Sequence, residues 1–298
     1  MTNELRGVLT ALAIPFDADE QIDVPVLRQV VDRSIAGGVH GVVAGGSTGE
    51  FATMTPDERI RMVEEVTAHV AGRVPVIAQT GAVTTAEAVR QSRAAQQAGA
   101  DVLMLVTPYY EALSLQETTT YLRDVAEQVE LPIMLYNIPG ATGVNLDPDT
   151  IGTLAEEFEH IRYVKDSGAN WEQGLQLIHH HGDRIGTFIG WDVYLYSALV
   201  EGAAGVMAGA ANVVPTEIVA IYDAITAGDL SGALAQWKRL YPVIDTMISG
   251  QFIPAVKAGL ELQGVPAGAP RRPMAPLSAQ GRAELRDALE LLQGAFAS

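Results

Sequence analysis

Lys165 has the residue type and the sequence position of a nucleophile towards carbonyl groups. It ends the apolar run Ile-Arg-Tyr-Val, so its stem is expected to lie against barrel or sheet side chains with its amine at the end of a strand. Partial burial disfavours the ammonium ion and so favours the neutral amine, which attacks carbonyl carbons. A lysine that is paired with Asp166 or Glu50 is the alternative. The chain has only three lysines. A lysine at the end of an apolar run is therefore more indicative of a function than it would be in a lysine-rich chain.

Tyr136 and the segment Gly-Gly-Ser-Thr-Gly-Glu at 45–50 could serve such a lysine. The phenol of Tyr136 also ends an apolar run, and it could donate and accept a proton near an imine. The 45–50 segment offers hydroxyls, backbone N–H groups and glycines that permit close approach, which suits a small carboxylate. It is not a P-loop, because no Gly-Lys-Ser/Thr follows at the required spacing. Alternatively, Tyr136 is only a packing residue, and the glycines of the 45–50 segment only form a turn.

The sequence gives little support to metal or dinucleotide sites. His179, His180 and His181 are neighbours on one expected helix, so they point in different directions, and no Asp, Glu or His accompanies them at ligand spacing. We expect a solvated helix end there. The glycines do not form a GxGxxG motif at a junction between a strand and a helix. Trp191 is interpreted as a pocket wall or as ordinary packing.

The residues that could do chemistry follow short apolar runs, which alternate with segments of helical periodicity. The expected strands are 7–14, 41–45, 74–80, 101–106, 132–137, 161–165, 186–190 and 204–209. The expected helices are 24–36, 56–71, 85–98, 115–129, 148–157, 171–181, 193–201 and 215–227. Signals for helix starts are Thr55-Pro56 with Glu58, Thr85 with Glu87, and Asp147-Pro148.

This alternation indicates an α/β fold in which a parallel sheet closes into a (β/α)8 TIM barrel with a C-terminal helical extension. We expect the barrel and its active site in residues 1–228, and a helical region packed on the barrel in residues 229–298. The active site of such a barrel is built from loops at the carboxyl ends of the strands. The polar segments of this chain fall at those ends, which places Lys165 and Tyr136 at one mouth.

Composition and charge exclude several classes of function. The chain has 298 residues, 48% of them hydrophobic, and a net charge of −17. A surface this negative repels phosphate backbones and anionic lipid heads, so nucleic-acid and membrane partners are not expected. No apolar run reaches the roughly 18 residues that span a bilayer. The absence of cysteine excludes disulfides and thiolate catalysis, and it fits a cytoplasmic protein.

Together these segments resemble the dihydrodipicolinate synthase / N-acetylneuraminate lyase family of class I aldolases. The resemblance covers nearly the whole chain and rests on the order and spacing of its motifs. They are TALAIPF (10–16), GGSTGE (45–50), TPYY (107–110), YNIPGATG (136–143), VKDSG (164–168), P-x-x-K-x-G (254–259) and RRPMAPL (271–277). The resemblance implies a pyruvate-dependent enzyme, a homotetramer built as a dimer of dimers, and no metal or organic cofactor.

The resemblance also implies a role for individual residues. Lys165 matches the Schiff-base lysine, and Tyr136 matches the tyrosine that relays protons. Tyr110 matches the tyrosine that reaches across a dimer interface into the neighbouring site. The residues implied in substrate binding are Ser47 and Thr48 for the carboxylate, Met207 near the pyruvate moiety, and Ser167, Gly190 and Asp192.

The sequence departs from both branches of this family. Synthases usually read Y-N-x-P-x-R-T-G, in which the arginine binds the carboxylate of the aldehyde, but Ala141 occupies that position here. Alanine cannot form the charge-assisted contact, whose loss costs about 1.5–3 kcal/mol. The segment Gly190-Trp191-Asp192 resembles the Gly-Tyr-Asp segment of the lyases, but Val193 replaces the acidic residue that follows it. A less polar pocket beyond the pyruvate is therefore expected.

The leading hypothesis is reversible aldol cleavage of a 2-oxo-4-hydroxy acid, such as a 2-keto-3-deoxy sugar acid. Dehydration of a 2-keto-3-deoxy acid could use the same imine. Dihydrodipicolinate synthesis is a further alternative, which Ala141 disfavours. Two others are a non-catalytic homologue that binds a 2-oxo acid, and a phosphate-binding barrel enzyme that uses the glycine-rich loop after the eighth strand.

Overall fold

The computed structural model describes residues 4–294, and its centre is a closed barrel of parallel strands. Each strand pairs with the next one along the chain, and β8 pairs with β1. The strands are β1 (Gly7–Ala11), β2 (Gly41–Ala44), β3 (Val76–Gln79), β4 (Val102–Val106), β5 (Ile133–Asn137), β6 (Ile161–Asp166), β7 (Gly186–Ile189) and β8 (Gly205–Ala208). The predicted barrel is confirmed.

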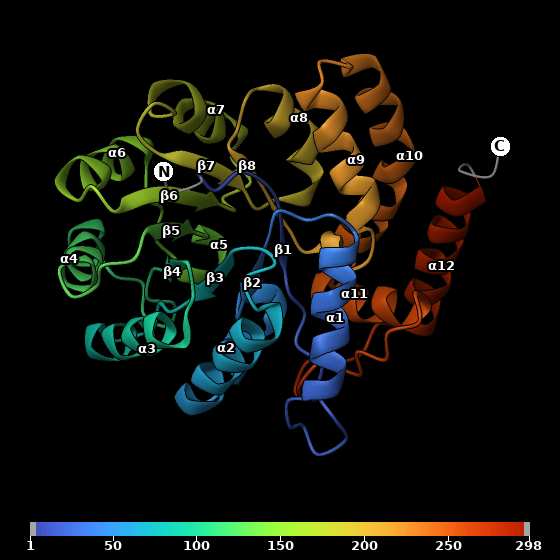
Figure 1. The fold of residues 1–298 in the computed structure, drawn as a ribbon, viewed down its shortest axis with the longest axis horizontal. Coiled ribbons are helices and arrows are strands. Elements are labelled where there is room, and N and C mark those ends of the chain that lie inside the picture. Colours follow the sequence, from blue (N-terminus) through green and yellow to red (C-terminus); the bar gives the residue numbers. More distant parts are fainter. Residues whose placement is uncertain (1–3, 295–298) are drawn as a thin grey trace.

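Helices follow the strands around the outside of this barrel (Figure 1). They are α1 (Val24–Ala36), α2 (Pro56–Val70), α3 (Thr85–Ala98), α4 (Leu115–Ala126), α6 (Pro148–Glu157), α7 (Trp171–His180), α8 (Leu195–Val200) and α9 (Pro215–Thr226). A short helix α5 (Pro139–Thr142) and four 3-10 turns were not predicted. The turns are η1 (Ser47–Gly49), η2 (Phe51–Thr53), η3 (Asp192–Tyr194) and η4 (Ala210–Asn212).

Two of the three predicted helix starts are confirmed. Thr55 and Glu58 form a capping box at α2, and the side chain of Asp147 accepts a hydrogen bond at the start of α6. The third was wrong by one residue. Thr84, with an extended backbone, accepts from the N–H of Glu87, whereas Thr85 is already helical. A cap must be non-helical for its side chain to reach that N–H group, which the sequence did not distinguish between two threonines.

The core consists of two layers, because alternate residues of each strand face opposite sides of the barrel wall. The interior layer contains Leu9, Ile77, Met104, Phe188 and Met207, all buried. Their neighbours along the strands belong to the layer between barrel and helices. Complete burial of an apolar side chain of this size contributes about 1.5–3 kcal/mol to stability. The filled interior leaves only the ends of the barrel open for function.

Three further helices form the C-terminal region: α10 (Leu230–Ser249), α11 (Phe252–Leu262) and α12 (Ala279–Gly294). Helix α10 packs on α9 and α12, and α11 contacts the η1 turn that follows β2 (Figure 1). The helical extension was therefore predicted correctly. The boundary between residues 228 and 229 stays a prediction, although it falls between α9 and α10.

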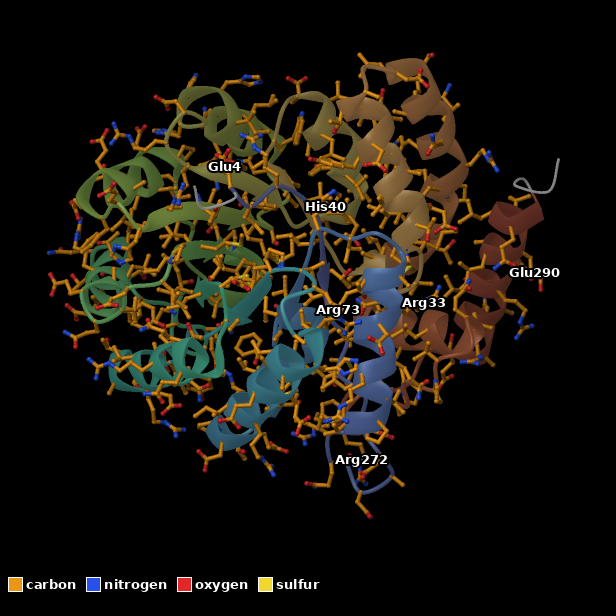
Figure 2. All side chains as sticks on the ribbon, in the orientation of Figure 1. Glu4, Arg33, His40, Arg73, Arg272 and Glu290 are labelled. Atoms are coloured by element: carbon orange, nitrogen blue, oxygen red, sulfur yellow. The ribbon has the colours of Figure 1, made fainter. Side chains whose placement is uncertain are left out.

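Charged side chains cover the outside of the molecule. Figure 2 shows Arg272 and Glu290 at the periphery of the molecule, away from the barrel. Arg73 pairs with Asp32, with 2.8 Å between nitrogen and oxygen. Within residues 4–294, no helix is long and apolar enough to cross a membrane.

Candidate active site

A cavity of about 320 Å³ lies among the residues at the carboxyl ends of the strands. Every predicted site residue except Tyr110 lines it. These are Ser47, Thr48, Tyr136, Lys165, Ser167, Gly190, Asp192 and Met207. The wall is completed by one residue of β1, by residues that follow β5, β7 and β8, and by residues of the C-terminal region: Ala11, Ile138, Trp191, Gly209, Ile248, Gly250 and Phe252.

Lys165 is held at the bottom of this cavity by β6. Its side chain is on the same face of the strand as Tyr163, which belongs to the barrel interior, and only 4% of the residue is exposed. Tyr136 is its partner in the register between β5 and β6. The Nζ atom of Lys165 lies 4.0 Å from the centre of the Tyr136 ring. The amine is therefore buried and placed against an aromatic face.

The alternative in which Lys165 forms an ion pair with Asp166 or Glu50 was wrong. The carboxylate of Glu50 lies 2.7 Å from the Nζ atom of Lys257 instead. Asp166 faces the other side of the strand, where its Oδ1 accepts hydrogen bonds from Asn137 Nδ2 at 2.9 Å and from the backbone of Gly168 at 3.2 Å. Alternation along a strand explains the result, since residues 165 and 166 must point to opposite faces.

Burial raises the pKa of the Asp166 carboxyl, and the hydrogen bonds from Asn137, Gly168 and Gln173 oppose that rise. Asn137 also accepts from the backbone N–H of Leu146 at 3.0 Å. The ends of β5 and β6 are therefore tied together one residue beyond Tyr136 and Lys165. This network fixes the relative position of the two predicted catalytic side chains.

Tyr136 and Ser47 form a pair of hydroxyls at the cavity wall. Their oxygens are 3.1 Å apart, and either can donate. Tyr136 is 1% exposed. Ser47 and Thr48 belong to the η1 turn, so the hydroxyls that were predicted to hold a carboxylate are beside the phenol that was predicted to move protons. A hydroxyl chain of this kind can pass a proton without bulk water.

Gly190 follows β7 directly, at a point where a side chain would meet Lys165 and Ser167. A Cβ atom there would lie 2.6 Å from Cε of Lys165 and 2.3 Å from Oγ of Ser167. The Ser167 hydroxyl donates to the carbonyl of Gly190 at 3.3 Å. Gly190 thus leaves space for the aliphatic part of the Lys165 side chain. Ser167 holds the loop that contains Gly190.

Asp192 lines the cavity and is buried, with one carboxylate oxygen accepting from the backbone N–H of Ala210 at 2.8 Å. Burial raises the pKa of this carboxyl to about 6, although backbone N–H groups and the charge of Lys165 oppose the rise. Asp192 therefore joins the loops after β7 and β8. Its predicted contact with substrate hydroxyls stays a prediction.

Tyr110 does not reach the cavity of its own chain. It is 86% exposed, in the loop after β4. The preceding residue, Tyr109, packs edge-on against Phe51 with 5.3 Å between ring centres. A role for Tyr110 in the site of a neighbouring subunit stays a prediction.

Sequence reasoning missed the part of the wall that comes from the C-terminal region. Ile248, Gly250 and Phe252, at the junction of α10 and α11, line the cavity. These residues have no chemical signature, and no periodicity shows which helix junction returns to the barrel mouth. Trp191, for which the sequence left two alternatives, lines the cavity with 38% of its surface exposed. Most of the wall beyond Lys165 is therefore apolar.

The charges at the site are few. Among the described lining residues, Lys165 is the one basic side chain. Ala141 lines a neighbouring cavity of about 280 Å³, which shares Ser47 and Ile138 with the first. Within the part of the chain that the structure describes, no cluster of three or more His, Asp or Glu residues could hold a metal ion. His179 pairs with Glu201 at 3.1 Å, outside the cavity.

Comparisons with known proteins agree with this fold. The model of the dihydrodipicolinate synthetase family matches residues 4–292. The chain is 35% identical over 282 residues to 4-hydroxy-tetrahydrodipicolinate synthase 1 of Halalkalibacterium halodurans, which covers 95% of each chain. A prophage protein of E. coli K12, from the dihydrodipicolinic acid synthase family and solved in complex with pyruvate, is 30% identical with a TM-score of 0.92 and covers 97% of this chain and 98% of its own. CdNal of Clostridium difficile, solved with mannosamine, is 28% identical with a TM-score of 0.90 and covers 98% and 99%.

Proposed function

The chain belongs to the dihydrodipicolinate synthetase family, and on that premise we propose that it is a pyruvate-dependent class I aldolase. It would cleave a 2-oxo-4-hydroxy acid reversibly to pyruvate and an uncharged aldehyde, through an imine on Lys165. The proposal rests mainly on the arrangement of three residues in the cavity. The buried amine of Lys165 lies over Tyr136, whose hydroxyl contacts Ser47, in a cavity whose other walls are mainly apolar.

The imine forms when the neutral amine of Lys165 adds to the C2 carbonyl of the substrate. The resulting carbinolamine loses water, for which the Tyr136 hydroxyl donates the proton and Ser47 connects it to the rest of the cavity. The hydroxyls of Ser47 and Thr48 and the adjacent N–H groups hold the carboxylate on C1. Two hydroxyls beside glycine-permitted backbone donors suit a small anion.

Cleavage then uses the iminium nitrogen as an electron sink. Tyr136 removes the proton of the 4-hydroxyl group, the C3–C4 bond breaks, and its electron pair moves through C2 to the nitrogen. The products are an aldehyde and an enamine of pyruvate on Lys165. Protonation of C3 and hydrolysis of the imine release pyruvate and restore the free amine.

The walls of the cavity favour an uncharged aldehyde. Ile138, Ile248, Trp191 and Phe252 surround the space beyond Lys165, and Ala141 provides no cation. A carboxylate that enters such a space without a partner loses its hydration, and transfer of an unpaired charge is strongly unfavourable. A 2-keto-3-deoxy sugar acid or an aldol with an apolar aldehyde part fits this cavity.

A second candidate is 4-hydroxy-tetrahydrodipicolinate synthase, in which the same pyruvate enamine would add to aspartate semialdehyde. Relatives such as the Halalkalibacterium halodurans protein are named for this reaction, and that is the observation in its favour. The missing arginine at position 141 stands against it. Dehydration of a 2-keto-3-deoxy acid is the remaining use of the imine, and it releases water and no pyruvate, because the C3–C4 bond stays intact.

A comparison of aldehyde substrates distinguishes the aldolase from the synthase. Wild-type protein and an Ala141→Arg variant would be assayed by NMR with pyruvate and either aspartate semialdehyde or a neutral aldehyde such as glyceraldehyde. We expect the wild type to favour the neutral aldehyde by at least about 10-fold, and Ala141→Arg to narrow that ratio by about 10-fold to 100-fold. A wild-type preference for aspartate semialdehyde would establish the synthase instead.

The assembly belongs to the same proposal. We infer a homotetramer built as a dimer of dimers from the family resemblance, and Tyr110, which is exposed in the loop after β4, does not line the cavity of its own chain. Tyr110 would complete the site of the partner subunit. A cytoplasmic location stays a prediction from the sequence.

A further inference from the structure

A buried ion pair joins the turn that contains Ser47 and Thr48 to the C-terminal region. Glu50 follows η1, and Lys257 belongs to α11. Their side chains are 0% and 1% exposed, with 2.7 Å between oxygen and nitrogen. The Lys257 ammonium also donates to the carbonyl of Ala269 at 3.1 Å. Since neither side chain lines the cavity that contains Lys165, the proposed mechanism does not use this pair.

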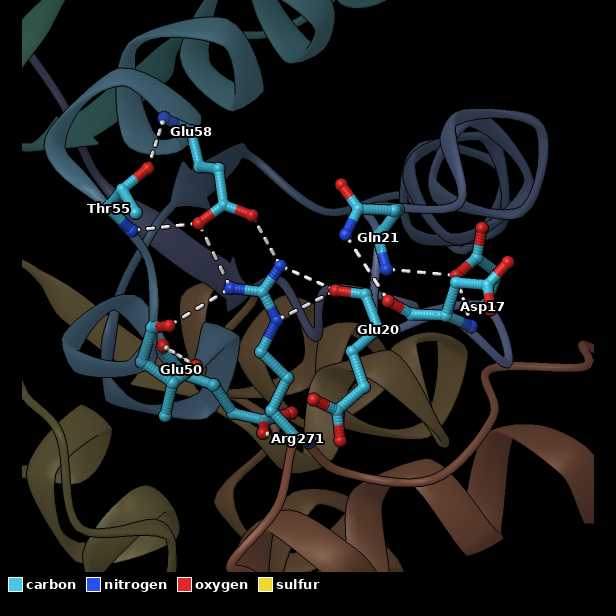
Figure 3. A network of polar contacts seen from close by, with 9 residues as sticks. Asp17, Glu20, Gln21, Glu50, Thr55, Glu58 and Arg271 are labelled. Carbon is cyan, nitrogen blue, oxygen red and sulfur yellow. Dashed lines mark hydrogen bonds and ion pairs between the residues drawn. The ribbon is translucent and has the colours of Figure 1, made fainter.

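Arg271 adds a second connection between the same two regions. Its backbone N–H donates to the other oxygen of Glu50 at 2.9 Å. Its guanidinium donates to the carbonyl of Thr53 at 2.9 Å and forms an ion pair with Glu58, the residue that completes the capping box of α2. Figure 3 shows the guanidinium enclosed between Glu58 and the backbone of Glu20. The C-terminal region thus holds the chain after β2 at three points.

The backbone at Glu50 needs this support. Its φ angle is 57°, in the left-handed region, between the turns η1 and η2. A non-glycine residue in that conformation costs about 1–3 kcal/mol and persists where its surroundings determine it. The N–H of Glu50 donates to the carbonyl of Ser47 at 3.0 Å. A change in the conformation of Glu50 would therefore rotate the turn that carries the Ser47 hydroxyl.

The pair is not explained by stability. Removal of two charges from water is costly, and apolar side chains of similar volume in place of a buried ion pair are often neutral or stabilising. A buried ion pair does specify the relative position of two segments, because either charge is strongly unfavourable in the interior unless the opposite charge lies beside it. Lys257 and Glu50 are 207 residues apart in sequence, so the specified geometry is that of α11 against the turn after β2.

We propose that Glu50, Lys257 and Arg271 are positioning residues, which hold the Ser47 and Thr48 hydroxyls in place for the carboxylate of the 2-oxo acid. The C-terminal region is then a part of the carboxylate-binding site and not only a cover for the barrel. This inference rests on the proposed function, since it assumes that a 2-oxo acid reacts at Lys165.

The test is the double variant Glu50→Gln/Lys257→Met, which removes both buried charges together and leaves neither one unpaired. Borohydride would trap the imine of Lys165 at increasing pyruvate concentrations. We expect the half-saturating pyruvate concentration to rise by about 10-fold, because weakening one hydrogen bond to the substrate carboxylate reduces binding by about this factor. The maximal trapping rate should change by less than about 3-fold, since Lys165 and Tyr136 are untouched.

The matched control is Glu261→Gln/Arg282→Met. This pair joins α11 to the start of α12, is partly exposed and includes no residue of the turn after β2. Its half-saturating concentration should equal that of the wild type. An unchanged value in the folded Glu50→Gln/Lys257→Met variant, or an equal rise in the control, would overturn the inference.

Circular dichroism and gel filtration would show whether the double variant folds. If it does not, a second variant tests the same inference. Glu50→Asp keeps the charge and withdraws the carboxylate by about 1.5 Å, the length of one C–C bond. We expect a rise of about 3-fold in half-saturating pyruvate with the fold retained, and no rise would overturn the inference. If wild-type protein forms no adduct at all, the proposed function fails first. If it forms one and the variants match it, only the positioning role fails.

Discussion

Lys165 and Tyr136 are opposite each other in the register of β5 and β6, with the lysine amine 4.0 Å from the ring centre. Their types and their places after apolar runs were readable in the sequence. The contact between Tyr136 and Ser47 was not, because the Ser47 hydroxyl comes from a 3-10 turn 89 residues earlier than Tyr136. At this scale the sequence predicted the candidate groups, and the fold determined which of them touch.

Tyr136→Phe should reduce aldol turnover by about 100-fold to 10,000-fold, the range typical for loss of a general acid or base. The ring remains and only the hydroxyl next to Ser47 is removed, so the fold should be retained. Turnover is followed by release of pyruvate. The control is Tyr163→Phe, a buried tyrosine of the barrel interior whose hydroxyl accepts from the backbone of Leu5. Equal turnover in wild type and Tyr136→Phe would remove Tyr136 from the mechanism.

Asp192→Asn should change how stability depends on pH. Burial raises the pKa of Asp192 from 3.8 to about 6, so the native state binds this proton more tightly than the unfolded state does. The resulting stabilisation is complete below about pH 4 and is lost as the pH rises through about 6, a change of about 3 kcal/mol. The asparagine variant cannot ionise, and it should therefore gain stability relative to wild type over that interval.

Denaturant unfolding between about pH 4 and pH 7 measures this difference. Asp287→Asn, an exposed substitution on α12, is the control and should show no such trend. If the free-energy difference between Asp192→Asn and wild type did not vary with pH, the carboxyl would not be buried as described.

At the scale of elements, alternating runs and helical periodicity were sufficient to find all strands of the barrel and the helices around it, with α1, α3 and α6 at their predicted bounds. What they missed are short elements. The four 3-10 turns and α5 have too few residues to show a period, and yet η1 carries Ser47 and Thr48. The capping residue of α3 was misplaced for a similar reason, since Thr84 and Thr85 differ only in backbone conformation.

Gly190→Ala tests how closely the end of β7 fits the lysine. A methyl group at this position would lie 2.6 Å from Cε of Lys165, so either the loop or the lysine must move. We expect the rate of imine trapping with pyruvate to fall by about 100-fold. Gly140→Ala is the control, because a methyl group there meets no atom within 4 Å. A Gly190→Ala protein with the wild-type trapping rate would show that the lysine stem is not confined at this point.

At the scale of the whole molecule, the sequence predicted a helical region that packs on the barrel, but not that it lines the cavity and pairs with the turn after β2. Ile248 and Phe252 are apolar residues among many, and Lys257 could be matched to Glu50 only in three dimensions. Contacts over such sequence separations depend on the packing of α10 and α11, which no local pattern encodes.

Subunit mixing tests whether Tyr110 acts in the neighbouring site. Lys165→Ala removes the lysine of the active site, and Tyr110→Phe removes the hydroxyl that the neighbouring subunit would contribute. Each variant alone should therefore be weakly active. In a mixed dimer, one site would combine the intact lysine of one subunit with the intact tyrosine of the other. We therefore expect mixing to restore aldol turnover to about a quarter of the wild-type value, as random pairing of two variants predicts. No gain over the separate variants would show that Tyr110 does not act across an interface.

Lys165 is proposed to form an imine with a 2-oxo acid, and borohydride reduction in the presence of pyruvate tests whether it does. Peptide mass spectrometry would locate the reduced adduct, with Lys165→Ala as the control. We expect a single pyruvate-derived adduct on Lys165, and no adduct on Lys238 or Lys257. A folded wild-type protein without an adduct, or with the same labelling in Lys165→Ala, would contradict this proposal.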